Sequence, residues 1–160
     1  YNDNFISCMP TNIYGPNDNF DPINSHVIPA MIRKFHEAKV NHESVVVLWG
    51  SGTPLREFLY VDDLANACVF LMNIYNKPFP INIGSGEEVS IKDLAKIIKD
   101  VIGFQGDVYF DLTKPDGTPR KFLNTEKLHR LGWKSQMPLR EGIKLAYQYF
   151  LSNKITEKKE

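Results

Sequence analysis

The chain has 160 residues, of which 42% are hydrophobic and 24% charged, and its 19 basic and 19 acidic residues give a formal net charge of zero. These values are typical of one folded domain with its own core, and they exclude a disordered segment and a protein whose main role is to coat nucleic acid. No apolar run is long enough to span a membrane, and the two cysteines, Cys8 and Cys68, are too few for a disulfide framework, so both are predicted to be buried thiols.

The first predicted elements are a strand, a turn-rich segment and a helix. Residues 5–9 form an apolar run that predicts a buried strand, and the segment 10–21 is rich in proline, glycine and asparagine. Ser25 is predicted to cap a helix from about Val27 to Ala38, whose apolar positions repeat at helical spacing.

The rest of the chain continues the alternation of strands with helices, and capping residues, glycine or proline bound most of the elements. Strands are expected at 44–49, 57–61, 80–83 and 107–111, and helices at 62–74, 91–101 (capped by Ser90 and ended by Gly103), 125–131 and 139–151, before a charged tail at 154–160. This order of elements indicates an α/β or α+β architecture.

Motifs of complete catalytic or metal sites are not found in the sequence. No G-x-G-x-x-G pattern follows a strand, and no tyrosine precedes a lysine by four residues in the manner of short-chain dehydrogenases. The four histidines lack the spacings of metal ligands, so no metal site is predicted. The residues by themselves therefore indicate a ligand-binding α/β domain without complete catalytic machinery.

Four side chains are candidate site residues, each with a structural alternative. His26 lies at a helix start and fits a general acid, or it hydrogen-bonds the preceding loop. Arg56 follows a glycine and proline turn and fits a diphosphate, or it pairs with a neighbouring acidic residue, Glu57 or Asp62. Trp49 fits a ligand surface, although its type favours the core, and Asp116 fits sugar hydroxyls or an Asx turn.

Four segments resemble a known family. Residues 10–16 are similar to the N-x-Y-G-P segment of extended short-chain dehydrogenases, and residues 17–30, 47–63 and 116–121 resemble the GDP-L-fucose synthase branch of that family. The resemblance covers nearly the whole chain. It implies an NADPH-dependent enzyme that takes GDP-4-keto-6-deoxy-D-mannose, epimerises ring carbons 3 and 5, and reduces the ketone to give GDP-L-fucose.

The resemblance also implies a division of the chain into parts. Residues 1–15 and 59–86 would be the distal strands of a Rossmann-type NADP-binding domain, and residues 16–58 and 87–153 a small α+β domain that binds the nucleotide sugar. The family's glycine loop, its Ser-Tyr-Lys group and its epimerising cysteine would lie upstream of Tyr1, and Cys8 is not that cysteine. The chain is therefore expected to be a C-terminal part that is inactive alone.

The roles implied by the resemblance fall on nine residues. The catalytic acid is His26. The residues at the nicotinamide end of NADP are Pro10, Thr11, Asn12, Ile13 and His26, and the residues that bind the GDP-sugar are Lys34, Trp49, Arg56 and Asp116. Lys34 stands where family members often have arginine, so it keeps the charge but not the bidentate geometry.

Other functions remain open at this point. The chain could belong to another extended short-chain enzyme that acts on UDP- or dTDP-sugars, or it could be a nucleotide-sugar-binding module without chemistry of its own. No nucleic-acid or membrane partner is predicted, a homodimer is implied for the parent enzyme by the resemblance, and the free thiols without a targeting signal predict the cytoplasm.

Overall fold

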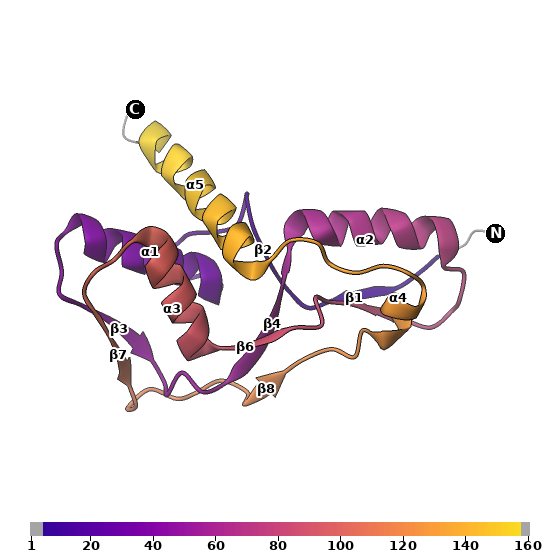
Figure 1. Cartoon of the computed structure of the whole chain (residues 1–160), viewed down its shortest axis with the longest axis horizontal. Coiled ribbons are helices and arrows are strands. Elements are labelled where there is room, and N and C mark those ends of the chain that lie inside the picture. Colours follow the sequence, from indigo (N-terminus) through magenta and orange to yellow (C-terminus); the bar gives the residue numbers. More distant parts are fainter. Residues whose placement is uncertain (1–4, 158–160) are drawn as a thin grey trace.

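The computed structural model describes residues 5–157, and the side chains of residues 5–152 (Figure 1). Residues 1–4 of the expected cofactor-binding part and residues 158–160 of the expected tail lie outside the described residues.

Three small sheets are built mainly from parallel strand pairs. One sheet pairs β1 (Cys8–Pro10) with β5 (Ile81–Ile83), and another pairs β3 (Val45–Trp49) with β7 (Asp107–Asp111), both in parallel. The third sheet is centred on β4 (Leu55–Tyr60), which pairs in parallel with β2 (Asn12–Tyr14) and β8 (Arg120–Lys121) and antiparallel with β6 (Glu88–Ser90). The mixed α/β class with parallel strands is thereby confirmed.

The helices gather in two places. Three helices pack together at one end of the molecule: α1 (Val27–Val40), α3 (Ile91–Ile102) and α5 (Leu139–Glu157) (Figure 1). Helix α2 (Val61–Ile74) lies at the other end, above β1 in this view. The short helix α4 (Glu126–Arg130) contacts β5. Each group buries its own apolar cluster, so the described residues form two cores.

The larger core lies under α1, α3 and α5. It includes Ile28, Met31, Ile32 and Phe35, the apolar positions expected on α1, and strand residues such as Leu48. The smaller core joins β5 and α2 to α4, and its buried members are Leu59, Ala67, Leu71, Tyr75, Ile81, Ile83, Leu128 and Trp133. The two cores follow the expected division only in part, since Leu128 and Trp133 pack in the smaller core and Tyr14 and Tyr60 in the larger one. The division into residues 1–15 with 59–86 and residues 16–58 with 87–153 stays a prediction.

The ends of α3 form as the sequence predicts. The Ser90 hydroxyl accepts a hydrogen bond from the backbone N–H of Asp93 at 3.0 Å, and Gly103 ends the helix with a left-handed φ of 73°. For α1 the expected cap is wrong, because His26, not Ser25, is the N-cap residue and no side chain caps the helix. The chain stays extended through His26, and the first helical bond runs from Ala30 N to His26 O at 2.9 Å.

Other differences concern short strands and helix ends. The first strand is Cys8–Pro10, and it is not buried as expected, since Met9 is 54% exposed. Side chains alternate along a strand, so Cys8 packs toward the smaller core while Met9 points away. Strands β2 and β6 have only three residues each and were not expected. Helix α5 continues past the expected end at Leu151 to Glu157, because no glycine or proline stops it.

The two cysteines are half-buried and free. Burial and the neighbouring Cys68 thiol raise the pKa of Cys8, so the two thiols, 60 residues apart in sequence, are neighbours between β1 and α2. In the part of the chain that the structure describes, no helix is long and apolar enough to cross a membrane.

Candidate functional site

A cavity of about 820 Å³ opens where β2 leads into the segment that precedes α1. Its walls come from the end of β2, from residues 15–18, from the first turn of α1 and from the start of α2, and it is named here the His26 cavity. The polar residues of its lining include Thr11, Asn12, Tyr14, Asp18, His26 and Asp62. Crevices at the carboxyl ends of parallel strands are the usual ligand sites of open α/β sheets.

His26 stands on the wall of this cavity. It is exposed, and among the described residues its imidazole makes no hydrogen bond, so the alternative in which it fastens the preceding loop is not found. Because the His26 imidazole has no hydrogen-bond partner among the described residues, it can contact a ligand bound in the cavity. Its expected role as an acid stays a prediction.

Of the five residues expected around the nicotinamide, four line the cavity, His26 among them. Thr11, Asn12 and Ile13 line it, whereas Pro10 ends β1 outside it. Thr11 is buried, and its hydroxyl donates to the carbonyl oxygen of Glu57 at 3.3 Å. The Asn12 amide donates to the same oxygen at 2.7 Å and accepts from Lys121 at 3.3 Å, so a ligand would meet mainly the backbone here.

A second cleft of about 490 Å³ lies beside the first, and Val27 lines both. The second cleft, named here the Arg56 cleft, brings together all four residues expected to bind a nucleotide sugar: Lys34, Trp49, Arg56 and Asp116. They come from α1, β3, β4 and the loop after β7, so 82 residues of sequence separate the first from the last (116 − 34).

The two cations of the Arg56 cleft are held by carbonyl oxygens. Lys34 Nζ donates to Val47 O at 2.6 Å, and an Arg56 guanidinium nitrogen donates to Leu55 O at 2.7 Å. Within the described residues neither cation forms an ion pair with a carboxylate, so the expected alternative of an Arg56 pair with Glu57 or Asp62 is not found. Both positive charges are therefore available to an anion.

Trp49 ends β3 with its indole 69% exposed, so the interpretation as a core residue is wrong. The alternation of β3 places Val46 and Leu48 in the core and turns Trp49 the other way. The Lys114 ammonium lies 5.6 Å from the ring centroid, which is a cation–π distance. The exposed ring face at the edge of the cleft is suited to a flat ligand group.

Asp116 closes the cleft by bonding to a distant loop. Its Oδ1 accepts from Ser51 N at 2.8 Å and its Oδ2 from the Ser51 hydroxyl at 2.7 Å, and these two bonds lower the pKa of Asp116. The expected Asx turn is not formed, since the partner is 65 residues away. Gly50 makes this approach possible, because a Cβ there would lie 2.3 Å from Asp116 Oδ1.

This bond predicts an effect of Ser51→Ala on ligand affinity. The change removes one of the two bonds that join loop 50–54 to Asp116, so the cleft wall loosens, and we expect the affinity for a nucleotide sugar to fall by roughly threefold. Titration calorimetry would measure the change. Ser85→Ala, which removes a hydroxyl from a turn outside the Arg56 cleft, is the matched control, and equal affinities of both variants would contradict the role of the bond.

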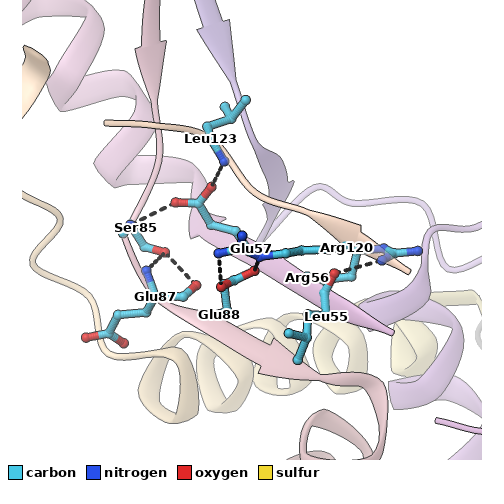
Figure 2. Close-up of polar contacts among 9 residues, drawn as sticks. Leu55, Arg56, Glu57, Ser85, Glu87, Glu88, Arg120 and Leu123 are labelled. Atoms are coloured by element: carbon cyan, nitrogen blue, oxygen red, sulfur yellow. Dashed lines mark hydrogen bonds and ion pairs between the residues drawn. The ribbon is translucent and has the colours of Figure 1, made fainter. Parts of the chain in front are cut away.

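Glu57 connects the elements around both clefts, although sequence reasoning considered it only as a partner for Arg56. It is fully buried, and its carboxylate accepts from Gly86 N at 2.8 Å. The carboxylate also accepts from Leu123 N at 3.2 Å (Figure 2). Its carbonyl oxygen accepts from Thr11 and Asn12, as described above. One strand residue thus fixes the end of β1, the turn before β6 and the chain after β8.

Two further residues were missed by the sequence reasoning. Ser51 was seen only as part of a turn, and Asp18 only as part of a motif. Ser51 lies 65 positions from Asp116, and their contact forms only when the two loops fold against each other. Asp18 shares the lining of the His26 cavity with His26, and the burial of its Oδ2 is a property of the folded chain. No pattern in the sequence marks either residue. Among the described residues no group of three potential metal ligands is found.

Comparison with known proteins identifies the family of the chain. The model of the NAD dependent epimerase/dehydratase family matches residues 1–84. GDP-L-fucose synthase 1 of Arabidopsis thaliana is 58% identical over 148 residues, which are 92% of this chain and 46% of the relative. GDP-L-fucose synthase of Escherichia coli is 48% identical, over 96% of this chain and 50% of the relative.

The solved structures include a close match in fold. The GDP-L-fucose synthetase from Naegleria fowleri bound to NADP superposes with a TM-score of 0.88 and 39% identity, over 95% of this chain and 48% of that chain. The chain spans about half the length of the curated relatives it matches.

Proposed function

Because the chain belongs to the NAD dependent epimerase/dehydratase family, we propose that it is the substrate-binding part of an NADPH-dependent 3,5-epimerase/4-reductase that converts GDP-4-keto-6-deoxy-D-mannose to GDP-L-fucose. The observation that supports this most directly is the Arg56 cleft, where two cations without carboxylate partners, an exposed indole and a carboxylate lie beside the His26 cavity.

The Arg56 cleft has the chemistry of a nucleotide diphosphate site. Arg56 and Lys34 would bind the diphosphate, Arg56 with a planar fork and Lys34 as a point charge. The exposed face of Trp49 would lie against a ring of the ligand. The Asp116 carboxylate keeps lone pairs free beyond its two bonds to Ser51, so it can also accept from a sugar hydroxyl.

The His26 cavity fits the reacting end of a sugar and of a nicotinamide. The backbone of Thr11, Asn12 and Ile13 would face the nicotinamide, and Pro10 would contact it only from outside the cavity. NADPH, when bound, supplies the hydride that reduces the ketone. His26 would return a proton to a ring carbon during epimerisation, which requires an acid within reach of that carbon.

The setting of the parent enzyme belongs to the same proposal. We expect a homodimer in the cytoplasm, without a nucleic-acid or membrane partner, in which residues 1–15 and 59–86 complete the cofactor domain. The balanced charge and the two free thiols support this setting.

Calorimetric titration of the chain with GDP-L-fucose, UDP-glucose and NADPH tests the proposal, with Arg56→Ala as the diagnostic variant. We expect selective binding of the GDP-sugar and an affinity about 10- to 100-fold lower for Arg56→Ala, because charge-assisted hydrogen bonds to the diphosphate are lost. Arg130→Ala, which removes an exposed arginine of α4 outside the cleft, is the matched control. Tighter binding of UDP-glucose, or no effect of Arg56→Ala, would contradict the proposed substrate.

A further inference from the structure

Asp18 holds an unsatisfied polar atom at the wall of the His26 cavity. Among the residues that the structure describes, Asp18 Oδ2 is the one buried side-chain nitrogen or oxygen without a hydrogen-bond partner. Its other oxygen, Oδ1, accepts from Asn19 N at 2.8 Å. Buried polar atoms are nearly always paired in native proteins, so an oxygen left without a partner beside a ligand cavity indicates a partner that arrives during function.

The position of Asp18 is fixed by its neighbours. Asn17 adopts a left-handed φ of 65°, an unusual conformation for a residue other than glycine. The Tyr149 hydroxyl of α5 donates to Asn17 Oδ1 at 2.9 Å, so the last helix holds this turn in place. These contacts hold the turn that carries Asp18, a residue that lines the cavity, in a defined conformation.

The charged groups around the cavity single out one partner for Asp18. Burial raises the pKa of Asp18, and the Asn19 N–H and the nearby His26 lower it in part, so Asp18 and His26, which both line the cavity, lie within electrostatic range of each other. The other titratable side chains that line the cavity are Tyr14 and Asp62. The Tyr14 hydroxyl already donates to Leu139 O, and Asp62 is an exposed carboxylate that has no proton to donate.

We propose that Asp18 is a positioning residue for His26: when a ligand closes the cavity, Asp18 Oδ2 accepts a hydrogen bond from the His26 ring N–H and fixes the imidazole in the orientation that delivers its proton. Hydrogen bonds of catalytic groups are often long in the free protein and shorten when substrate binds. A carboxylate behind a histidine also sets which ring nitrogen holds the proton. This inference rests on the proposed function, because it assigns a partner to the proposed acid.

A double-mutant cycle in the full-length protein that carries this chain tests the coupling. The four proteins are the unmodified form, Asp18→Asn, His26→Asn and the double variant, and the readout is kcat and KM for epimerisation, followed as deuterium incorporation from D2O into the sugar ring. We expect Asp18→Asn to lower kcat by about 10- to 100-fold with KM changed by less than about threefold, and to add less than about twofold in the His26→Asn background.

Stability and a matched variant separate positioning from a structural role. Asp18→Asn keeps Oδ1, the oxygen that is hydrogen-bonded, so we expect its Tm to equal that of the unmodified protein. Asp21→Asn makes the same change three residues away, where the carboxylate accepts from the backbone N–H groups of Ile23 and Asn24, and should keep full activity. A clear fall in the Tm of Asp18→Asn would overturn the proposal in favour of a structural carboxylate.

The outcomes also separate this inference from the proposed function. If Asp18→Asn lowered kcat by the same factor in both backgrounds, or raised KM without changing kcat, Asp18 would contact the ligand directly. The inference would then fail while the proposed function stands. No deuterium incorporation by the unmodified protein would refute the function and the inference with it.

Discussion

Replacement of His26 by asparagine is expected to lower epimerisation of a GDP-4-keto-sugar by about 10²- to 10⁴-fold in the full-length protein, the usual contribution of a general acid or base. Asparagine fills a similar volume but cannot exchange a proton near neutral pH. Because His26 lines the cavity and makes no hydrogen bond to the described protein, the variant should fold normally and bind the GDP-sugar with an affinity within about threefold of the original.

The measurement is deuterium incorporation from D2O at ring carbons 3 and 5, together with calorimetric affinity for GDP-L-fucose. His42→Asn is the matched control, because His42 is exposed and has a left-handed φ of 56° that asparagine readily adopts. Unchanged exchange in His26→Asn would exclude the acid role. A large loss of affinity would instead make His26 a binding residue.

The regular elements could be predicted because local signals determine them. For α3, the serine cap, the glycine that ends the helix and the helical spacing of the apolar residues all indicate the same bounds. Strands β2 and β6 lack such signals, because three residues are too short for a period and their pairing with β4 depends on residues more than 30 positions away. The N-cap of α1 was misplaced for a related reason, since Ser25 has the preferred side chain but the chain turns helical one residue later.

The candidate site could also be predicted only in part. The resemblance named residues whose positions in four distant segments converge in the Arg56 cleft, and no spacing rule could have grouped them. Residue type alone misjudged Trp49, because the preference of tryptophan for the core ignores which face of β3 it occupies. Ser51 was missed because its contact with Asp116 crosses between loops, where the sequence has no period to follow. Asp18 was missed because the burial of its Oδ2 beside the His26 cavity is a property of the folded chain alone.

Glu57→Ala is expected to be the most destabilising single change in the region around the clefts. The Glu57 side chain is fully buried, and its two oxygens pair the backbone N–H groups of Gly86 and Leu123. Removing it leaves both N–H groups without a partner, at about 1–3 kcal/mol each, and leaves a cavity besides, so the free energy of unfolding should fall by about 3 kcal/mol or more. Glu57→Gln keeps one acceptor oxygen and should lose about 1–3 kcal/mol.

The backbone fits closely around the Glu57 carboxylate. Gly84 lies so close that a Cβ there would be 2.3 Å from Glu57 Oε1, so the turn before β6 is shaped around the carboxylate. Urea unfolding, followed by the fluorescence of the buried Trp133, measures the loss. Glu87→Ala, an exposed carboxylate on the same turn, is the matched control and should change stability by less than about 0.5 kcal/mol. Equal stability of the Glu57 and Glu87 variants would mean that water replaces the lost bonds, and that the clefts do not depend on this carboxylate.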